Sequence, residues 1–100
     1  MTTHLVLLAY NEEAGIGKHL AEIRDLRLPD LSAIVVNDGS TDRTASIVRE
    51  IGKAMNLDLL SHDRNRGVAA VFDTGLRHAA AISAPSDFVI TMEADGTNDP

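Results

Sequence analysis

Four short apolar runs alternate with three amphipathic stretches along the chain. The runs cover residues 5–10, 33–37, 57–60 and 88–92. They are continuous rather than alternating, which is typical of strands covered on both faces. Strands that alternate with helices through short connections predict βαβ units, a parallel sheet and right-handed crossovers. The pattern therefore predicts an α/β fold: a Rossmann-like parallel sheet in the order 3-2-1-4, with helices on both faces.

The boundaries and buried faces of the three helices follow from capping residues and apolar spacing. The first helix is expected to begin near Glu12 or Glu13 and to end by Pro29. The second is expected to begin after Ser40 or Thr41, which are both good capping residues. The predicted buried faces are Ile16, Leu20 and Ile23; then Val48, Ile51 and Met55; then Val68, Val71, Phe72, Gly75, Leu76 and Ala79.

Polar motifs follow all four predicted strands. They are Tyr-Asn-Glu-Glu at 10–13, Asn-Asp-Gly-Ser-Thr-Asp at 37–42, His-Asp-Arg-Asn-Arg-Gly at 62–67 and Glu-Ala-Asp-Gly at 93–96. Ligands of such sheets bind beyond the carboxyl ends of the strands, where the strand order reverses, here between the first and fourth strands. Glu93 and Asp95 are two apart in extended backbone, so both acids can face one ligand. Carboxylate oxygens are ligands that Mg²⁺ and Mn²⁺ prefer.

Each motif also has an ordinary structural interpretation. Capping is the favoured role of Thr41 and Asp42. Glu12 and Glu13 could complement the dipole of the first helix, and Asp-Gly at 38–39 is a common turn. The histidines have no partner at ligand spacing, so we expect surface positions without a role for His4, His19, His62 and His78.

Length, charge and composition narrow the function classes. One hundred residues fit one domain, residues 1–100, with a single core. A net charge of -6 argues against a nucleic-acid partner, because phosphate backbones need clustered Lys and Arg. With no Cys, disulfides and thiolate metal sites are excluded. The sequence shows no signal peptide. No apolar run approaches the ~20 residues that are needed to span a bilayer, so we expect a soluble, cytoplasmic chain.

The four motifs, in this order and spacing across nearly the whole chain, resemble the family-two glycosyltransferases of the GT-A fold. The similarity is greatest to the dolichol- or polyprenyl-phosphate mannosyl- and glucosyltransferase branch. It implies a nucleotide-sugar-binding half of a GT-A domain and a GDP- or UDP-linked sugar donor. It also implies a lipid phosphate as a possible acceptor, which would place the full-length protein at the inner face of the membrane.

The resemblance also implies roles for individual residues. A nucleotide-sugar site would include Leu8, Tyr10, Asn11, Glu12, Val36, Asp38, Glu93, Ala94 and Asp95, with Asp38 accepting hydrogen bonds from the base. A Mg²⁺ or Mn²⁺ site would include Asp95, Glu93 and Thr97. Several positions depart from the family pattern. Leu8 stands where Pro is usual, Glu93 where the first Asp of Asp-x-Asp is usual, Thr97 where a metal-binding Gln is frequent, and Ala69 and Ala70 where a second glycine pair is usual.

In such a reaction a divalent cation offsets the negative charge that develops on the departing diphosphate. The acids would then hold the cation rather than act as general bases, and we assign no catalytic residue within the chain. Acceptor-side residues follow the Asp-x-Asp motif in this family, so we expect a domain truncated near Pro100 that does not turn over alone. The alternatives are a non-catalytic nucleotide-binding module and, third, a receiver- or phosphatase-like phosphotransfer domain. The sugar, the base and the oligomeric state stay open.

Overall fold

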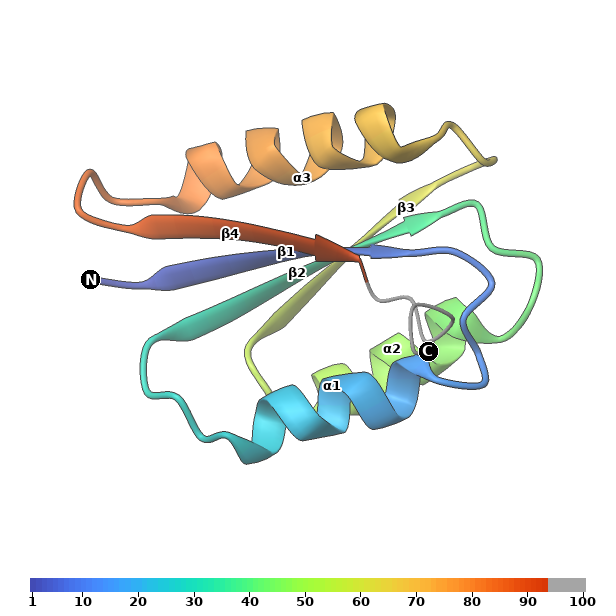
Figure 1. Ribbon diagram of the computed structural model, residues 1–100, viewed down its shortest axis with the longest axis horizontal. Coiled ribbons are helices and arrows are strands. Elements are labelled where there is room, and N and C mark those ends of the chain that lie inside the picture. Colours follow the sequence, from blue (N-terminus) through green and yellow to red (C-terminus); the bar gives the residue numbers. More distant parts are fainter. Residues whose placement is uncertain (94–100) are drawn as a thin grey trace.

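The computed structural model describes residues 1–93, and the side chains up to Met92. Within this range the chain forms β1 (Thr3–Ala9), α1 (Ile16–Asp25), β2 (Leu31–Asp38), α2 (Thr44–Gly52), β3 (Leu57–His62), α3 (Val68–Ile82) and β4 (Phe88–Glu93). The strands make one parallel sheet in the order β3-β2-β1-β4, which confirms the predicted order. Helices α1 and α2 cover one face, and α3 covers the other (Figure 1).

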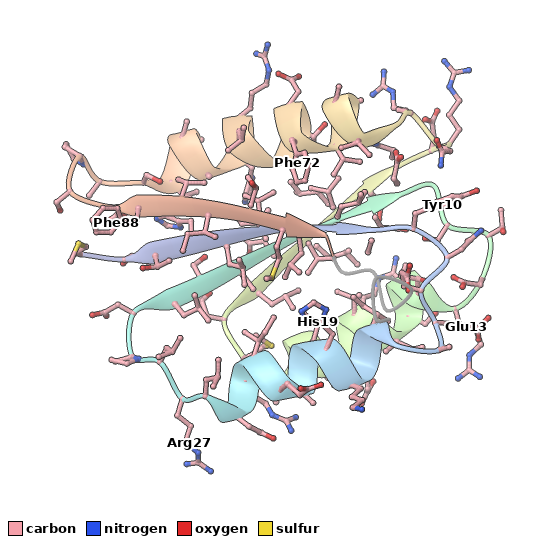
Figure 2. All side chains as sticks on the ribbon, in the orientation of Figure 1. Tyr10, Glu13, His19, Arg27, Phe72 and Phe88 are labelled. Carbon is pink, nitrogen blue, oxygen red and sulfur yellow. The ribbon has the colours of Figure 1, made fainter. Side chains whose placement is uncertain are left out.

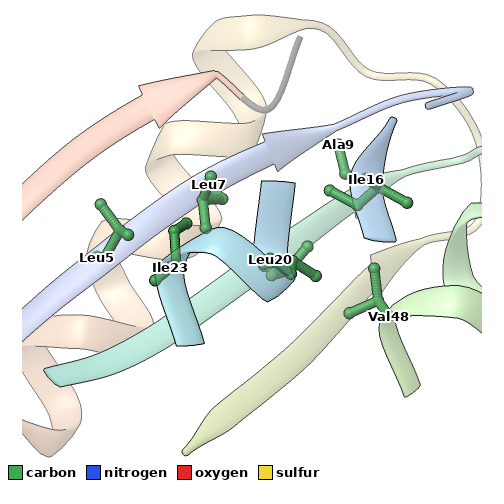
Figure 3. Close-up of a cluster of buried hydrophobic side chains, with 8 residues drawn as sticks. Leu5, Leu7, Ala9, Ile16, Leu20, Ile23 and Val48 are labelled. Carbon is green, nitrogen blue, oxygen red and sulfur yellow. The ribbon is translucent and has the colours of Figure 1, made fainter. Parts of the chain in front are cut away.

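The continuous apolar runs of β1 and β2 supply both faces of the core, because successive side chains of a strand point to opposite sides of the sheet. Leu7 of β1 and Val35 of β2 are fully buried on the α1–α2 side, together with Leu20 of α1 (Figure 3). Val6 and Val36 are fully buried on the other side, beneath α3. The two central strands therefore have the double coverage that the sequence predicts.

The edge strand β4 does not have that coverage, so the prediction of burial on both faces is wrong there. Its apolar side chains Phe88, Val89, Ile90 and Met92 are between 39% and 58% exposed. Among the described elements β4 pairs only with β1, and its contact with α3 is slight. The apolar composition of residues 88–92 predicts a buried strand. Burial, however, depends on which elements pack against the strand, and composition does not determine that.

Helices α1 and α2 begin later than predicted. Helix α1 starts at Ile16 rather than near Glu12, and α2 starts at Thr44 rather than after Ser40. The backbone N–H of Glu12 donates to Thr44 at the start of α2, and that of Glu13 donates to Asp42 in the β2–α2 loop, so the segment before α1 is held in turns. Met55 also lies beyond α2, which ends at Gly52, although its side chain still packs against the core.

Only part of the predicted apolar face of α3 is buried. Val71, Gly75 and Ala79, spaced four apart, face the sheet. Val68 is 48% exposed and Leu76 is 43% exposed, since they lie on the flank of the helix. Gly75 marks the closest approach: a Cβ there would lie 2.3 Å from Val6 Cγ1. None of the described helices is both long and apolar enough to span a membrane.

Candidate functional site

Three loops at the carboxyl edge of the sheet carry most of the sequence motifs. They follow β1, β2 and β3, and they cover residues 10–15, 39–43 and 63–67. Figure 2 shows Tyr10 and Glu13 at this end of the molecule and Arg27 at the opposite end. The parallel arrangement thus brings motifs that are far apart in sequence to one edge, as predicted.

The strand register aligns predicted site residues at the point where the strand order reverses. Leu8 of β1 lies opposite Val36 of β2 on one side and opposite Glu93 of β4 on the other. Val36 is fully buried beneath α3, so it supports the edge from below rather than lining its surface. Tyr10 is 40% exposed just past the end of β1. The backbone of β1 therefore joins the β2 and β4 parts of the predicted site.

The β1–α1 and β2–α2 loops are joined by short polar side chains. Asn11 has a positive φ of 49°, and its Oδ1 accepts the N–H of Thr41 at 2.8 Å. The Asn11 N–H in turn donates to Ser40 Oγ at 3.0 Å, and the Glu12 N–H donates to Thr44 Oγ1 at 2.8 Å. These reciprocal bonds fix the first loop against the second. They give Asn11 a structural role at the position where the sequence predicts a nucleotide contact.

Neither Thr41 nor Asp42 occupies the cap position of α2, which is Arg43 and makes no side-chain capping bond, so the predicted capping role of both is wrong. Asp42 lies one residue earlier and instead binds the first residue of the helix. The Asp42 carboxylate accepts the Thr44 N–H at 2.9 Å and the Thr44 hydroxyl. It also accepts the Glu13 N–H at 3.2 Å. Burial would raise the pKa of Asp42, but these hydrogen bonds outweigh burial and hold the pKa below its usual value. Asp42 is therefore an ionised carboxylate satisfied by protein donors.

Asp38, at the end of β2, is the most enclosed of the carboxylates that the structure describes at this edge. It is 2% exposed, and its Oδ1 lies 2.8 Å from His62 Nδ1. The N–H groups of Arg66 and Gly67 donate to its two oxygens, each at 2.9 Å. Burial raises the pKa of Asp38, yet His62 and the two backbone donors bring it below the ordinary value. Asp38 consequently ties the end of β2 to the β3–α3 loop.

Sequence reasoning missed two of the four histidines. His4 and His62 were expected at the surface, but both side chains are buried, with 5% and 6% exposure. His4 Nε2 lies 2.9 Å from Asp87 Oδ2, and His62 pairs with Asp38. The sequence signal for His62 was only that it and Asp38 follow neighbouring predicted strands; the register that places them opposite one another comes from the structure.

Within the described part of the chain, no three His, Cys, Asp or Glu side chains gather in a way that could hold a metal ion. The predicted ligands lie outside it: the structure describes the backbone of Glu93 but not its side chain, and not Ala94, Asp95 or Thr97. Two of the carboxylates that it does describe at this edge, Asp38 and Asp42, accept hydrogen bonds from the protein. The metal site stays a prediction.

A pocket of about 380 Å³ opens at the other end of the sheet. Its lining includes Ile23 near the end of α1, Arg27 just after this helix, Leu31 at the start of β2 and Met55 after α2. None of the four sequence motifs contributes to this lining. We therefore base the candidate site on the motif-bearing loops and not on this cavity.

Comparisons with known proteins identify the family of the chain. The sequence profile described as "Glycosyl transferase family 2" matches residues 5–100. The poly-beta-1,6-N-acetyl-D-glucosamine synthase of Staphylococcus epidermidis is 30% identical over 90 residues, which is 90% of this chain and 21% of the synthase.

Two solved structures have the same arrangement. The structure of S. aureus TarS 1–349 in complex with UDP-GlcNAc matches with a TM-score of 0.82 and 26% identity, over 95% of this chain and 27% of that one. The mannosyltransferase PcManGT from Pyrobaculum calidifontis, in complex with GDP-Man and Mn²⁺, matches with a TM-score of 0.80 and 31% identity, over 93% and 27%. The fold is that of the GT-A glycosyltransferases. This chain belongs to glycosyl transferase family 2, and it spans about a quarter of the length of these solved relatives.

Proposed function

We propose that this chain forms the nucleotide-sugar-binding part of a glycosyltransferase. The observation that carries the proposal is the family match over residues 5–100, together with the motif-bearing loops that gather at the carboxyl edge of the sheet. Parallel α/β sheets bind ligands at this edge, where the strand order reverses. The donor is a sugar linked to a nucleoside diphosphate, either GDP or UDP. Neighbouring structures that hold UDP-GlcNAc and GDP-Man support this donor class.

The base and ribose would lie against the loop after β1 and the end of β2. Leu8, Tyr10 and Glu12 would line them from β1 and its loop, with Asn11 fixing that loop through Thr41. Val36 and Asp38 would support the base from β2. Asp38 already accepts three hydrogen bonds, and a carboxylate has about four acceptor sites. It therefore has room for a single donor from the base unless the β3–α3 loop moves.

The diphosphate would lie near the end of β4, where Glu93, Ala94, Asp95 and Thr97 contribute. A Mg²⁺ or Mn²⁺ ion held by Asp95, Glu93 and Thr97 supplies Lewis-acid stabilisation of the departing diphosphate. The neighbouring mannosyltransferase that holds Mn²⁺ supports a metal of this kind. The chain's own contribution is to bind and orient the donor, so that the sugar–phosphate bond faces the acceptor.

For the acceptor we propose a lipid phosphate, with the full-length protein working at the inner face of the membrane. The motif pattern of the polyprenyl-phosphate branch supports this acceptor. Such a phosphate is already ionised, so the transfer needs no general base from this chain. Incubating the full-length protein with a radiolabelled donor and polyprenyl phosphate tests the assignment. Transfer to a polysaccharide and none to the lipid would contradict it.

Calorimetric titration with GDP and UDP, with and without Mn²⁺, tests the nucleotide site. We expect Mn²⁺ to tighten binding of one nucleotide roughly tenfold, equivalent to about 1.4 kcal/mol, and Asp95→Ala to abolish that gain. Asp73→Ala is the matched control, because Asp73 pairs with Arg77 on the exposed side of α3. Nucleotide binding without any metal dependence would favour a non-catalytic binding module. Equal affinity in every condition for wild type and Asp95→Ala would refute the site assignment.

A further inference from the structure

A buried chain of hydrogen bonds runs from the end of β2 through the end of β3 to the middle of α3. His62 lies at its centre. Its Nδ1 is 2.8 Å from Asp38 Oδ1, and its Nε2 is 2.8 Å from Thr74 Oγ1. The side chains of His62 and Asp38 are only 6% and 2% exposed. Both ring nitrogens thus have a partner, and the imidazole is held in one orientation.

The direction of these hydrogen bonds follows from the charge of Asp38. The pKa of Asp38 lies below its ordinary value, because the donors of His62, Arg66 and Gly67 outweigh the effect of burial. The carboxylate is therefore ionised at neutral pH and can only accept. His62 must then donate from Nδ1–H to Asp38. In the neutral imidazole, Nε2 is an acceptor, and the Thr74 hydroxyl donates to it.

The same carboxylate holds the backbone of the β3–α3 loop, residues 63–67. Its two oxygens accept the N–H groups of Arg66 and Gly67 at 2.9 Å. The β2–α2 loop packs directly on this backbone, since a Cβ on Gly39 would lie 2.2 Å from the carbonyl carbon of Arg64. The orientation of one carboxylate therefore sets the position of a loop that borders the candidate nucleotide site.

We propose that His62 is a positioning residue of the nucleotide site, which acts by orienting the Asp38 carboxylate and through it the β3–α3 loop. This inference rests on the proposed nucleotide-binding function. It assigns a role to a histidine for which the sequence predicted none. Without the Nδ1 donor, Asp38 would lose one of its three protein partners and could rotate away from the loop N–H groups. The bond from Nε2 to Thr74 only orients the ring.

Two substitutions at His62 separate the functions of its two nitrogens. The amide nitrogen of Asn is attached to Cγ, as Nδ1 of His is, so His62→Asn keeps a donor for Asp38 and loses the Thr74 contact. His62→Gln places its amide further along the side chain, near the position of Nε2, and loses the donor to Asp38. We expect His62→Asn to bind nucleotide nearly as well as wild type. His62→Gln should bind roughly tenfold more weakly.

Two further variants serve as controls. Thr74→Val removes the hydroxyl but leaves the His62–Asp38 contact, so we expect wild-type affinity. His78→Ala removes another His–Asp pair between α3 and β3, in which His78 Nε2 lies 2.9 Å from Asp58 Oδ2, and it should also leave affinity unchanged. Equal affinities of His62→Asn and His62→Gln, in a protein that binds nucleotide, would overturn the proposal.

Amide hydrogen exchange of Arg66 and Gly67 tests the positioning step without any nucleotide. We expect their N–H groups to exchange at wild-type rates in His62→Asn and faster in His62→Gln. Equal exchange in the two variants would overturn the positioning role even if nucleotide binding is confirmed. Conversely, a wild-type chain that binds neither GDP nor UDP would refute the proposed function, while the exchange rates would still decide whether His62 positions the loop.

Discussion

Replacing Gly39 by Ala should strongly destabilise the fold, because two independent costs fall on this residue. Its φ of +71° lies in the left-handed region, where an L side chain costs about 1–2 kcal/mol. In addition, an added Cβ would lie 2.2 Å from the carbonyl carbon of Arg64 and 2.4 Å from the amide nitrogen of Asn65. These are backbone atoms, so a rotamer change cannot relieve the clash.

The magnitude follows from what the clash displaces. The β3–α3 loop would have to move by about 1 Å to reach an ordinary contact. Such a shift would weaken the hydrogen bonds from Arg66 and Gly67 to Asp38, and bonds to a charged group contribute about 1.5–3 kcal/mol each. Strain plus the loss of one such bond gives roughly 3–5 kcal/mol. That is a large share of the roughly 5–15 kcal/mol of total stability usual for a domain.

Urea denaturation followed by circular dichroism measures this change in the free energy of unfolding. The matched control is Gly52→Ala at the end of α2, where the added Cβ would meet Leu57 Cδ2 at 3.4 Å, an ordinary contact. We expect the control to be neutral or to stabilise by up to about 1 kcal/mol, because Ala favours a helix. A Gly39→Ala protein within about 1 kcal/mol of wild type would refute the steric argument.

Three further predictions follow. Hydrogen bonds from His4 and from two backbone N–H groups lower the pKa of Asp87 to about 2, so its contribution to stability is complete above about pH 4 and is lost as the pH falls through 2. The difference in unfolding free energy between wild type and Asp87→Asn should therefore be full at pH 5 and should shrink at pH 2. An equal difference at the two pH values would contradict this. Gly75→Ala should cost about 1–3 kcal/mol by overpacking against Val6, and Val6→Ala should partly rescue it in a thermal-unfolding cycle; additive effects would contradict the contact. Asn11→Ala should cost about 1–2 kcal/mol and weaken nucleotide binding, because Thr41 loses its acceptor; calorimetry showing wild-type affinity would contradict the loop argument.

The sequence predicted the layers and the strand order well, because apolar periodicity and the short connections leave few alternatives. It failed where the outcome depends on neighbours. The exposed strand β4 has a core-like composition in Phe88 and Ile90, yet lies at an edge. The predicted helix starts near Glu12 and Ser40 were wrong because hydrogen bonds hold these segments in turns. Those bonds join residues that are 29 to 32 positions apart in the sequence.

The candidate site shows the same division. That the motifs meet at one edge follows from a parallel sheet, and so this could be predicted. The partners of Asp38 could not be predicted from motifs alone, since a carboxylate after a strand suits a ligand, a turn or a buried pair equally well. The choice among these is made by strand register, which puts His62 opposite Asp38. Continuous apolar runs carry no alternation that would fix the register of β2 against β3, and so the sequence pattern favours a surface position for His62.

The central place of β1 has a consequence for the order of assembly during translation. Its neighbour β2 is complete at residue 38, but its other neighbour β4 begins only at residue 88. At a synthesis rate of about 5–20 residues per second, roughly 3–10 s separate the two partners at the ribosome. During that interval one side of the first strand has no β-partner. Helix α3, which covers Val6, is itself complete only at residue 82, so in a nascent chain the open side of β1 and the face beneath α3 are both closed late.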